Sequence, residues 1–210
     1  MYVRNHMLPK DKLITVQLKE NVKSALDKII EGDFLSLPVL DGDEFKGIIM
    51  KEAIYRTYFE GNYDDREKFL LNTTVEELYN DEYKSIKEYE LIENASYLLK
   101  ELRTPFLPVF DKRGNFVGIL THFAIFNAFA EIFGFDKGTR IVVYMFDIPG
   151  QLAKLTEVLK KEDINILNFA VMDAKVLGVY KVVLRVDTEN VERLIDKIEK
   201  AGFKVGDIVK

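Results

Sequence analysis

Two stretches of the chain are nearly the same, LPVLDGDEFKGIIM at Leu37–Met50 and LPVFDKRGNFVGIL at Leu107–Leu120. Each runs Leu-Pro-Val, one apolar residue and Asp, then a polar turn, and then a Gly followed by apolar residues. Their prolines, Pro38 and Pro108, stand 70 residues apart. A stretch that recurs in this way indicates that a whole structural unit is repeated.

The residues around each stretch predict the elements of the repeat. Segments 22–30 and 92–102 place apolar residues at three- and four-residue spacing, which is typical of an amphipathic helix. Each quoted stretch reads as two short strands joined by a tight turn, a β-hairpin. Each repeat therefore reads strand–helix–strand–strand–helix. The first strands are predicted at LITV (13–16) and YKSI (83–86), and the last helices at KEAIYRTYF (51–59) and HFAIFNAFAEIF (122–133).

The segment between the repeats, EGNYDDREKFLLN at 60–72, begins polar and acidic and is expected to be a connection. After it, Thr74 followed by Glu77 forms a capping-box pair. Such a pair predicts a short helix or turn at the start of the second repeat.

The pattern changes after residue 136. The remaining residues predict the order βαββαβ, which is that of a ferredoxin-like fold. The predicted segments are strand 140–146, helix 149–162, strands 164–174 and 179–186, helix 191–202 and a short strand within 203–209. We therefore expect an α/β (α+β) protein of three parts, with boundaries at 1–66, 67–136 and 137–210.

The composition argues against several kinds of protein. The 210 residues carry a net charge of −5 and no long basic run, which argues against nucleic-acid binding. There is no Cys, and His6 and His122 are too few for a histidine-rich metal site. The N-terminus lacks the apolar region of a signal peptide, and no apolar run is long enough to span a membrane, so we expect a cytoplasmic protein. No GxxxxGK[ST], GxGxxG, HExxH or GxSxG motif is present, and we expect no catalytic activity.

Each repeat resembles a CBS motif, and the two together resemble a CBS tandem with pseudo-two-fold symmetry. The resemblance rests on the apolar set of the first helix and on Pro-Val, Asp and Gly at matching positions of the hairpins. Residues 137–210 resemble an ACT domain, whose helix follows a Pro-Gly-x-Leu turn, here Pro149–Leu152, and whose second strand begins with the INI of 164–166. The order of the parts is similar to that of acetoin-utilisation-type regulators and bacterial cyclic di-AMP-binding CBS–ACT proteins.

This resemblance implies a regulatory protein. A CBS pair binds an adenine nucleotide in its central cleft, here AMP, ATP or cyclic di-AMP, and an ACT domain pairs with a second copy or binds an amino acid. Two other interpretations remain open: a structural pairing module with vestigial sites, and an accessory regulator of acetoin or amino-acid metabolism. A homodimer and an unknown downstream protein are the expected partners.

The resemblance assigns nucleotide-binding roles in both repeats. Thr121 stands where CBS motifs contact phosphate with a hydroxyl, and the alternative is an ordinary helix N-cap. His122 lines the same cleft or is merely solvated, and Met50 flanks the base or belongs to the core. The backbone groups that CBS motifs offer to the base belong to Thr104, Pro105 and Phe106 in the second repeat and to Phe34, Leu35 and Ser36 in the first.

Both repeats depart from the nucleotide-binding pattern. CBS motifs often continue Gly-h-h-Thr/Ser-x-x-Asp, where h is apolar and the Asp holds the ribose hydroxyls. Ala53 and Ala124 stand at the Asp position, and Met50 takes the hydroxyl position of the first repeat. Either the ligand lacks a free ribose diol, which favours cyclic di-AMP, or one or both sites are empty. The retained hydroxyl favours the site at Thr121.

In the third part, the turn before the first helix is the expected amino-acid site, which the resemblance to ACT domains places at a dimer interface. The free amide groups at a helix start can hold a carboxylate, and the alternative is a helix start without a ligand. The residues that the resemblance assigns are Asp147, Gly150, Gln151, Leu152 and Asn165.

The helix predicted at 122–133 is apolar around most of its surface. It carries Phe123, Phe126, Phe129 and Phe133 together with Ile125 and Ile132. One exposed face does not explain so many apolar residues, so we expect a subunit interface of a homodimer. The alternatives are burial against its own domain and, less readily, a helix lying on a membrane.

Overall fold

The computed structural model describes residues 1–102 and 104–209. The chain forms two compact units, the first from Met1 to Phe126 and the second from Asn127 onward. Both repeats lie within the first unit, apart from the end of the last helix of the second repeat.

The first unit contains both predicted hairpins and the helices around them. Its strands are β1 (Leu8–Pro9), β2 (Val16–Gln17), β3 (Ser36–Asp41), β4 (Glu44–Met50), β5 (Ile86–Lys87), β6 (Phe106–Phe110) and β7 (Phe116–Thr121). Its helices are α1 (Val22–Glu31), α2 (Lys51–Glu60), α3 (Arg66–Asn72), α4 (Ile92–Leu102) and α5 (His122–Ile132), of which α5 continues into the second unit. Short 3₁₀ turns lie at Val3–Asn5, Lys10–Lys12 and Val75–Glu77.

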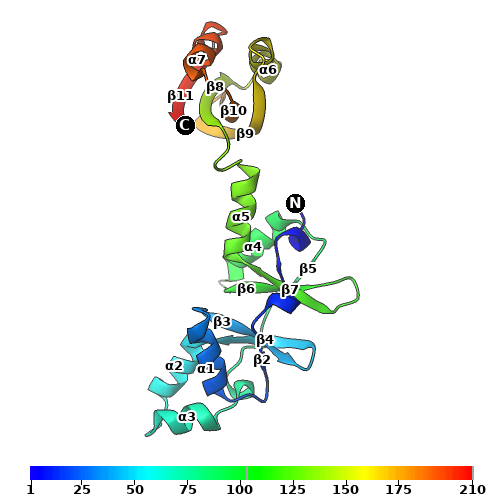
Figure 1. The fold of residues 1–210 in the computed structure, drawn as a ribbon, viewed down its shortest axis with the longest axis vertical. Helices are drawn as coiled ribbons and strands as arrows, with labels where there is room; N and C mark the ends of the chain where they lie inside the picture. Colours follow the sequence, from blue (N-terminus) through cyan, green and yellow to red (C-terminus); the bar gives the residue numbers. More distant parts are fainter. Residues whose placement is uncertain (103, 210) are drawn as a thin grey trace. The chain divides into compact units, whose positions relative to one another are not determined.

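These strands form two sheets, one for each repeat (Figure 1). The first sheet has the order β2-β3-β4 and the second β1-β7-β6-β5. In each sheet the short first strand of the repeat is parallel to its neighbour, and the hairpin is antiparallel. Each hairpin also has a register shift at the matching place, between Val39 and Leu40 and between Val109 and Phe110. The two repeats in the sequence therefore have the same structure, and they share even the register shift in the hairpin.

Each hairpin is extended by a segment that precedes the other repeat, an arrangement that we call the strand exchange. Leu8 of β1 pairs with Ile119 of β7, and Asn80 forms an antiparallel bridge with Ile48 of β4. In that bridge, each backbone N–H donates to the other residue's carbonyl, at 2.8 and 2.9 Å. The two repeats are thus joined through backbone hydrogen bonds, not through side chains alone.

The strand exchange explains the glycine that both quoted stretches contain. A Cβ atom on Gly47 would lie 2.2 Å from the carbonyl oxygen of Asn80, and a Cβ on Gly118 would lie 2.3 Å from that of Leu8. No side chain fits at either position, because the neighbouring backbone occupies the space.

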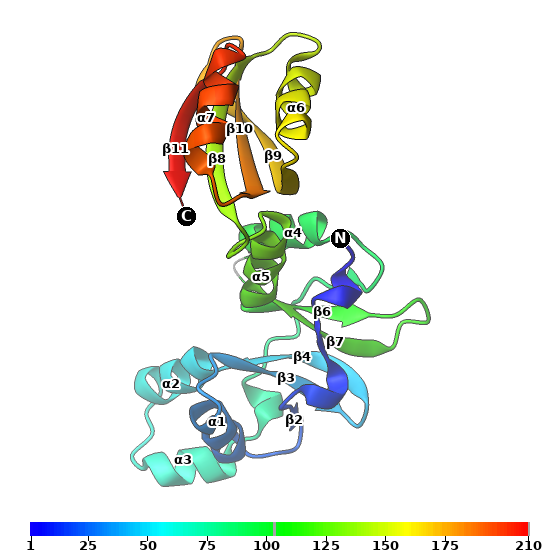
Figure 2. The ribbon, with the colours of Figure 1, turned by 45° about the horizontal axis from the view of Figure 1, so that its top comes forward.

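Two of the groups of buried side chains in the first unit position the hairpins. One covers the outer side of the first sheet, where residues of α1, α2 and α3 pack on β2–β4 (Figure 2). The other lies between the two hairpins, so that each repeat supplies half of it. Its buried members are Leu40, Phe45, Ile48, Phe106, Phe116 and Ile119.

The second unit has the predicted ferredoxin-like arrangement. It contains β8 (Thr139–Phe146), α6 (Gln151–Lys161), β9 (Asn165–Val176), β10 (Val179–Asp187), α7 (Val191–Lys200) and β11 (Lys204–Val209). The sheet order is β11-β8-β10-β9, and all its pairs are antiparallel. Alternate residues of β8 and β10 pack with the apolar stripes of α6 and α7 in one core, so both helices cover the same face.

Within the second unit, polar side chains from the sheet hold the end of α5 and the segment after it. Asn168 donates a hydrogen bond to the carbonyl of Ile132, and Arg185 donates to those of Phe133 (3.0 Å) and Lys137 (3.2 Å). These bonds satisfy carbonyl groups that lack partners at the end of a helix.

Several local predictions were wrong. The first strands of the repeats are β2 and β5, which begin at the last residues of the predicted segments 13–16 and 83–86. The connection at 60–72 contains the helix α3, and the strand β1 was not predicted. The capping box of Thr74 and Glu77 is confirmed, since Glu77 accepts a hydrogen bond from the Thr74 backbone N–H at 2.8 Å.

Candidate functional site

The first unit contains a cavity of about 430 Å³ between the two repeats, which we call the inter-repeat cleft. It is built from the end of β4, the segment before β5, the end of α4 and the start of β6. The lining residues are Ile48, Met50, Asn80, Glu82, Tyr83, Lys84, Leu102, Thr104 and Pro105. Its volume lies within the range of about 300–1,000 Å³ that is usual for small-molecule sites.

Backbone pairing places the polar residues of the cleft. Asn80 is fixed by its bridge to Ile48, and its side-chain oxygen accepts a hydrogen bond from the Glu82 backbone N–H at 2.9 Å. The next residue, Tyr83, packs edge-on against the ring of Phe45, with a centroid distance of 4.8 Å. The segment 80–84 therefore follows a set path along the edge of the first hairpin.

Three of the residues assigned from the sequence line the inter-repeat cleft: Met50, Thr104 and Pro105. The hydroxyl of Thr104 donates to the carbonyl of Phe106 at 3.0 Å, which fixes the start of β6. Phe106 itself is buried among the side chains between the hairpins. Phe106 would therefore contact a ligand through its backbone groups and not through its side chain.

Thr121 lies at the start of α5, opposite Phe106 in the β6–β7 ladder. Its hydroxyl oxygen accepts a hydrogen bond from the backbone N–H of Ala124 at 3.1 Å, so Thr121 caps the helix. A hydroxyl has one proton to donate besides its two acceptor positions. The capping bond leaves that proton available for a phosphate oxygen.

His122, the next residue, is exposed, and its Nδ1 lies 3.4 Å from the carbonyl oxygen of Pro105. When Nδ1 carries the proton, it donates to this carbonyl, and Nε2 remains available to another group. Thr121, His122 and Pro105 thus lie close together where β6, β7 and α5 meet.

The cleft also contains polar groups that the sequence did not reveal. Lys84 supplies a positive charge and Glu82 a carboxylate, and both side chains are exposed to solvent. Burial, aided by the negative charge of Glu44 and opposed by Lys46, raises the pKa of the Tyr83 phenol above its ordinary value of 10.0. Tyr83 therefore keeps its proton at neutral pH and can donate a hydrogen bond.

The matching residues of the first repeat lie at the start of β3. Phe34 and Leu35 are exposed, and Ser36 faces Met50 across the β3–β4 ladder. The carbonyl of Leu35 accepts a hydrogen bond from the backbone N–H of Lys51 at 2.9 Å. This carbonyl is thus already satisfied by the start of the next helix.

In the second unit, the predicted amino-acid site is the turn between β8 and α6. Gly150 is the N-cap of α6 with a left-handed φ of 87°, and its carbonyl accepts from the Lys154 backbone N–H at 2.9 Å. Asp147 and Leu152 are exposed. The negative charge of Asp147 raises the pKa of the Tyr180 phenol above 10.0.

The structure does not bring all five predicted amino-acid-binding residues together within one chain. Gln151 lines a pocket of about 190 Å³ formed with the end of β8 and the start of β11. Asn165 pairs with Asp187 of β10 at the other end of the sheet, the end at which β8 begins with Thr139 opposite Val186. The length of β8 therefore separates Asn165 from the turn by about 20 Å, at about 3.3 Å per residue.

The described residues contain no group of three or more His, Asp or Glu side chains that could hold a metal ion. Over the same residues, no helix has both the length and the apolar character to cross a bilayer.

Two family models match the chain. Residues 3–60 and 75–131 match the CBS domain, and residues 139–203 match the ACT domain. A CBS domain-containing protein of Dictyostelium discoideum is 27% identical over 126 residues, which are 58% of this chain and 87% of that protein.

Solved structures of CBS proteins are similar in fold. CBSX2 of Arabidopsis thaliana, in a complex with AMP, has 25% identity and a TM-score of 0.54, and the match covers 62% of this chain and 97% of that one. CbpB in complex with c-di-AMP has 21% identity and a TM-score of 0.53, with 62% and 85% covered. At such identity the second likeness shows the fold alone. The chain therefore belongs to the CBS-domain family, and an ACT domain follows its two CBS domains.

Proposed function

We propose that this chain is a non-catalytic regulatory sensor that binds an adenine nucleotide in the inter-repeat cleft. The observation that carries the proposal is the convergence on this cleft of Met50, Thr104 and Pro105 with the cation of Lys84. The ring of His122 adjoins the carbonyl of Pro105 and Thr121 pairs with Phe106, so we assign the phosphate to these two side chains. CBS and ACT domains are regulatory modules, and the similar CBSX2 is described with AMP. We expect the protein to work in the cytoplasm.

Glu82 offers an answer to the missing ribose acceptor. Ala124 takes the place of the Asp that holds the ribose diol in many CBS motifs, and alanine has no polar group. Glu82 brings a carboxylate to the same cleft from the segment between the repeats. A carboxylate accepts two hydrogen bonds from a diol, so AMP and ATP need not leave the ribose unpaired. Cyclic di-AMP, whose 3′ oxygen lies within the phosphodiester, depends less on this group.

The ACT domain is proposed to pair two copies of the chain. The turn at Gly150 and the side chain of Asn165 lie at opposite ends of one sheet, so an amino-acid site that uses both must take Asn165 from a second copy. The exposed phenylalanines of α5 give a further apolar surface for such a homodimer. A nucleotide that binds one arrangement of the modules better than another would shift their populations and alter contacts with a downstream protein.

The decisive experiment is a calorimetric titration of the full chain, with AMP and with cyclic di-AMP, which measures the affinity for each ligand. We expect Thr121→Val to weaken the binding of both ligands about tenfold or more, because each carries a phosphate that loses a charge-assisted hydrogen bond. Thr121→Ser, which retains the hydroxyl and the helix cap, should restore most of the affinity. Glu82→Gln should weaken AMP more than cyclic di-AMP.

Thr156→Val, the same substitution at a helix threonine of the second unit, serves as the matched control and should leave both affinities unchanged. A ligand at one hundred times its Kd raises the free energy of unfolding by about 2.7 kcal/mol, so a thermal-shift panel tests the wider set of nucleotides. The sensor proposal is wrong if AMP, ATP and cyclic di-AMP all leave the melting temperature unchanged. In that case the chain is a pairing module with vestigial sites.

A further inference from the structure

The first unit contains a second cavity, which is lined by other residues than the inter-repeat cleft. It has a volume of about 340 Å³ and lies among the three helices of the first repeat; we call it the helical pocket. Its lining residues are Leu26 of α1, Ile54, Tyr55, Tyr58 and Phe59 of α2, and Arg66, Phe69 and Leu70 of α3. None of these residues lines the inter-repeat cleft.

The walls of the helical pocket are apolar and well packed. Leu26, Ile54 and Leu70 are buried, and they form its floor within the core of the first repeat. Tyr58 packs against Phe69 with a centroid distance of 5.5 Å. Tyr63, which lies outside the pocket, packs against the same Phe69 ring at 4.5 Å. Aromatic contacts of this kind hold the wall in one shape before any ligand arrives.

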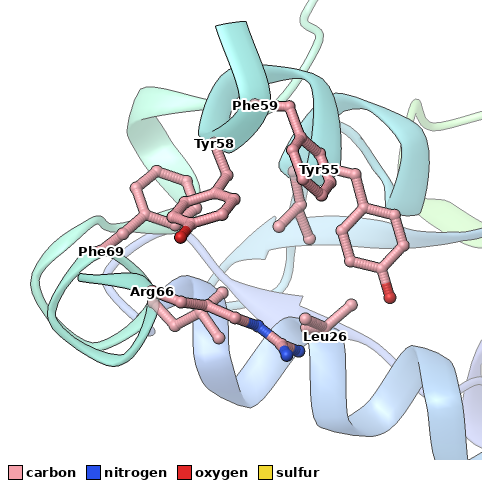
Figure 3. Close-up of a pocket in the computed structure, with 8 residues that line it drawn as sticks. Leu26, Tyr55, Tyr58, Phe59, Arg66 and Phe69 are labelled. Atoms are coloured by element: carbon pink, nitrogen blue, oxygen red, sulfur yellow. The ribbon is translucent and has the colours of Figure 1, made fainter. Parts of the chain in front are cut away.

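Arg66 is the only charged residue that lines this pocket among the described residues. Figure 3 shows its side chain on the opposite side of the pocket from Tyr55 and Phe59, with the guanidinium turned towards Leu26. Over the described part of the chain, no carboxylate lies within the 4.0 Å ion-pair distance of this guanidinium. The partners of its acidic neighbours in the sequence explain why Arg66 has no such ion pair.

The two acidic residues that flank Arg66 in the sequence, Asp65 and Glu67, have other partners. Asp65 is the N-cap of α3 and accepts hydrogen bonds from the backbone N–H groups of Glu67 and Lys68, at 2.8 and 3.2 Å. Glu67 lies 3.9 Å from Lys23. Arg66 therefore presents five N–H donors and a positive charge at an apolar cavity without a counter-ion from its own neighbourhood.

From this arrangement we propose that the helical pocket binds a small apolar carboxylate, with its aromatic or branched body among the α2 side chains and its carboxylate on Arg66. Pockets for such ligands are mainly apolar, with a few polar groups that fix the orientation. A guanidinium matches a carboxylate through two parallel hydrogen bonds.

A second copy of the chain fits the pocket less well. The apolar surface that this chain offers most openly is α5, where Phe123 and Phe126 are 74% and 67% exposed. The one acidic residue of α5, Glu131, lies five residues after Phe126 and therefore about 140° around the helix from it, at about 100° per residue. Arg66 is exposed to solvent, so a contact through Phe126 would take its positive charge out of water without placing a carboxylate opposite it, which is costly.

The test is a calorimetric titration of the full chain with naphthalene-2-carboxylate and with the neutral naphthalene-2-carboxamide. We expect the carboxylate to bind about tenfold more tightly than the amide. Arg66→Gln should remove that difference, and Arg66→Lys should restore part of it. Arg56→Gln is the matched control, because Arg56 is an exposed arginine of α2 that is paired with Glu52 and does not line the pocket.

NMR spectra of the full chain check the place of binding. The methyl signals of Leu26, Ile54 and Leu70 should shift when the carboxylate is added. Equal affinity for the two probes, or an equal effect of the Arg66→Gln and Arg56→Gln variants, would overturn the proposal. So would a carboxylate that binds only as the chain dissociates in sedimentation, since a second copy would then be the natural occupant. The result does not depend on nucleotide binding, because neither probe contains a phosphate or a base.

Discussion

At the scale of single residues, Glu20 shows how a turn of the first repeat is fixed. Its carboxylate accepts hydrogen bonds from the Ser24 hydroxyl (2.6 Å), the Lys28 ammonium (2.8 Å) and the backbone N–H of Gln17 (2.9 Å). Burial alone would raise the pKa of Glu20, but these hydrogen bonds outweigh it and lower the pKa below its ordinary value of 4.5. The folded state therefore favours the ionised carboxylate.

This lowered pKa predicts a pH-dependent contribution to stability. An acid whose pKa is lower in the folded state stabilises that state above its unfolded pKa, and the gain is lost as the pH falls through the folded pKa. We expect Glu20→Gln to reduce the free energy of unfolding by about 1 kcal/mol at neutral pH. The difference between variant and wild type should stay constant down to about pH 5 and shrink below 4.5. Urea unfolding at a series of pH values measures it.

The second repeat provides the control. Glu90 accepts a hydrogen bond from the Lys87 backbone N–H at 2.9 Å, as Glu20 does from Gln17, but Leu98 stands where the first repeat has Lys28. Glu90→Gln should therefore cost less than Glu20→Gln at neutral pH. Equal losses, or a Glu20 effect that does not change with pH, would show that the lysine contact contributes nothing.

At the scale of secondary-structure elements, the strand exchange depends on two glycines. We expect Gly47→Ala and Gly118→Ala each to reduce the free energy of unfolding by about 2–3 kcal/mol, because the added methyl group meets backbone that cannot move aside. Gly47→Ala should also increase amide exchange at Asn80 and weaken nucleotide binding, since the path of segment 80–84 depends on that bridge. Urea unfolding and hydrogen exchange check both effects.

Gly114→Ala separates the clash from the general cost of replacing glycine. Gly114 lies in a hairpin turn with φ 88°, and a Cβ there meets no atom within 4 Å. Its replacement should cost only about 1 kcal/mol through backbone strain. If all three variants lose the same stability, the close approach of the exchanged segments is not what requires Gly47 and Gly118.

The elements that could be predicted from the sequence are those whose signals are local. Amphipathic spacing predicted α1 and α4, and the two apolar runs on either side of a polar turn predicted both hairpins. β1 is two residues long and is defined by pairing with the distant strand β7, so no local pattern marks it. α3 had a usable signal, an Asp N-cap before Phe69, Leu70 and Leu71, but the acidic start of the segment concealed it.

The same distinction holds for the candidate site. Thr104, Pro105 and Met50 could be assigned because they lie beside a recognisable hairpin, and the structure places them on the cleft. Glu82 and Lys84 could not, since they come from a segment without periodicity that only the bridge between Asn80 and Ile48 brings to the cleft. The nucleotide-binding role of all of these residues remains a prediction.

At the scale of the whole molecule, α5 is the surface on which we expect two copies to meet. Ile125 and Ala128 are buried against the chain itself, whereas Phe123 and Phe126 remain exposed. Phe126→Glu should therefore raise the dimer Kd about 30-fold or more without unfolding the chain. Sedimentation velocity over a range of concentrations measures the change.

Ile30→Glu is the matched control, because Ile30 is 51% exposed at the end of α1, outside both α5 and the second unit. This variant introduces the same charge on an apolar residue outside α5 and should leave the dimer intact. A wild-type chain that sediments as a monomer at micromolar concentration would contradict the interface, as would a Phe126→Glu variant that dimerises normally.

The strand exchange has a consequence for the way the CBS pair can fold. β1 is made near the beginning of synthesis, but its partner β7 follows about 110 residues later. Contacts between such distant residues form slowly, because a long loop must close before the pairing stabilises it. Removing the first ten residues would take a strand from the sheet of the second repeat while leaving β2, β3 and β4 of the first repeat in place. β1 is thus the first strand to be synthesised, but the sheet to which it belongs cannot be completed until β7 has also been made.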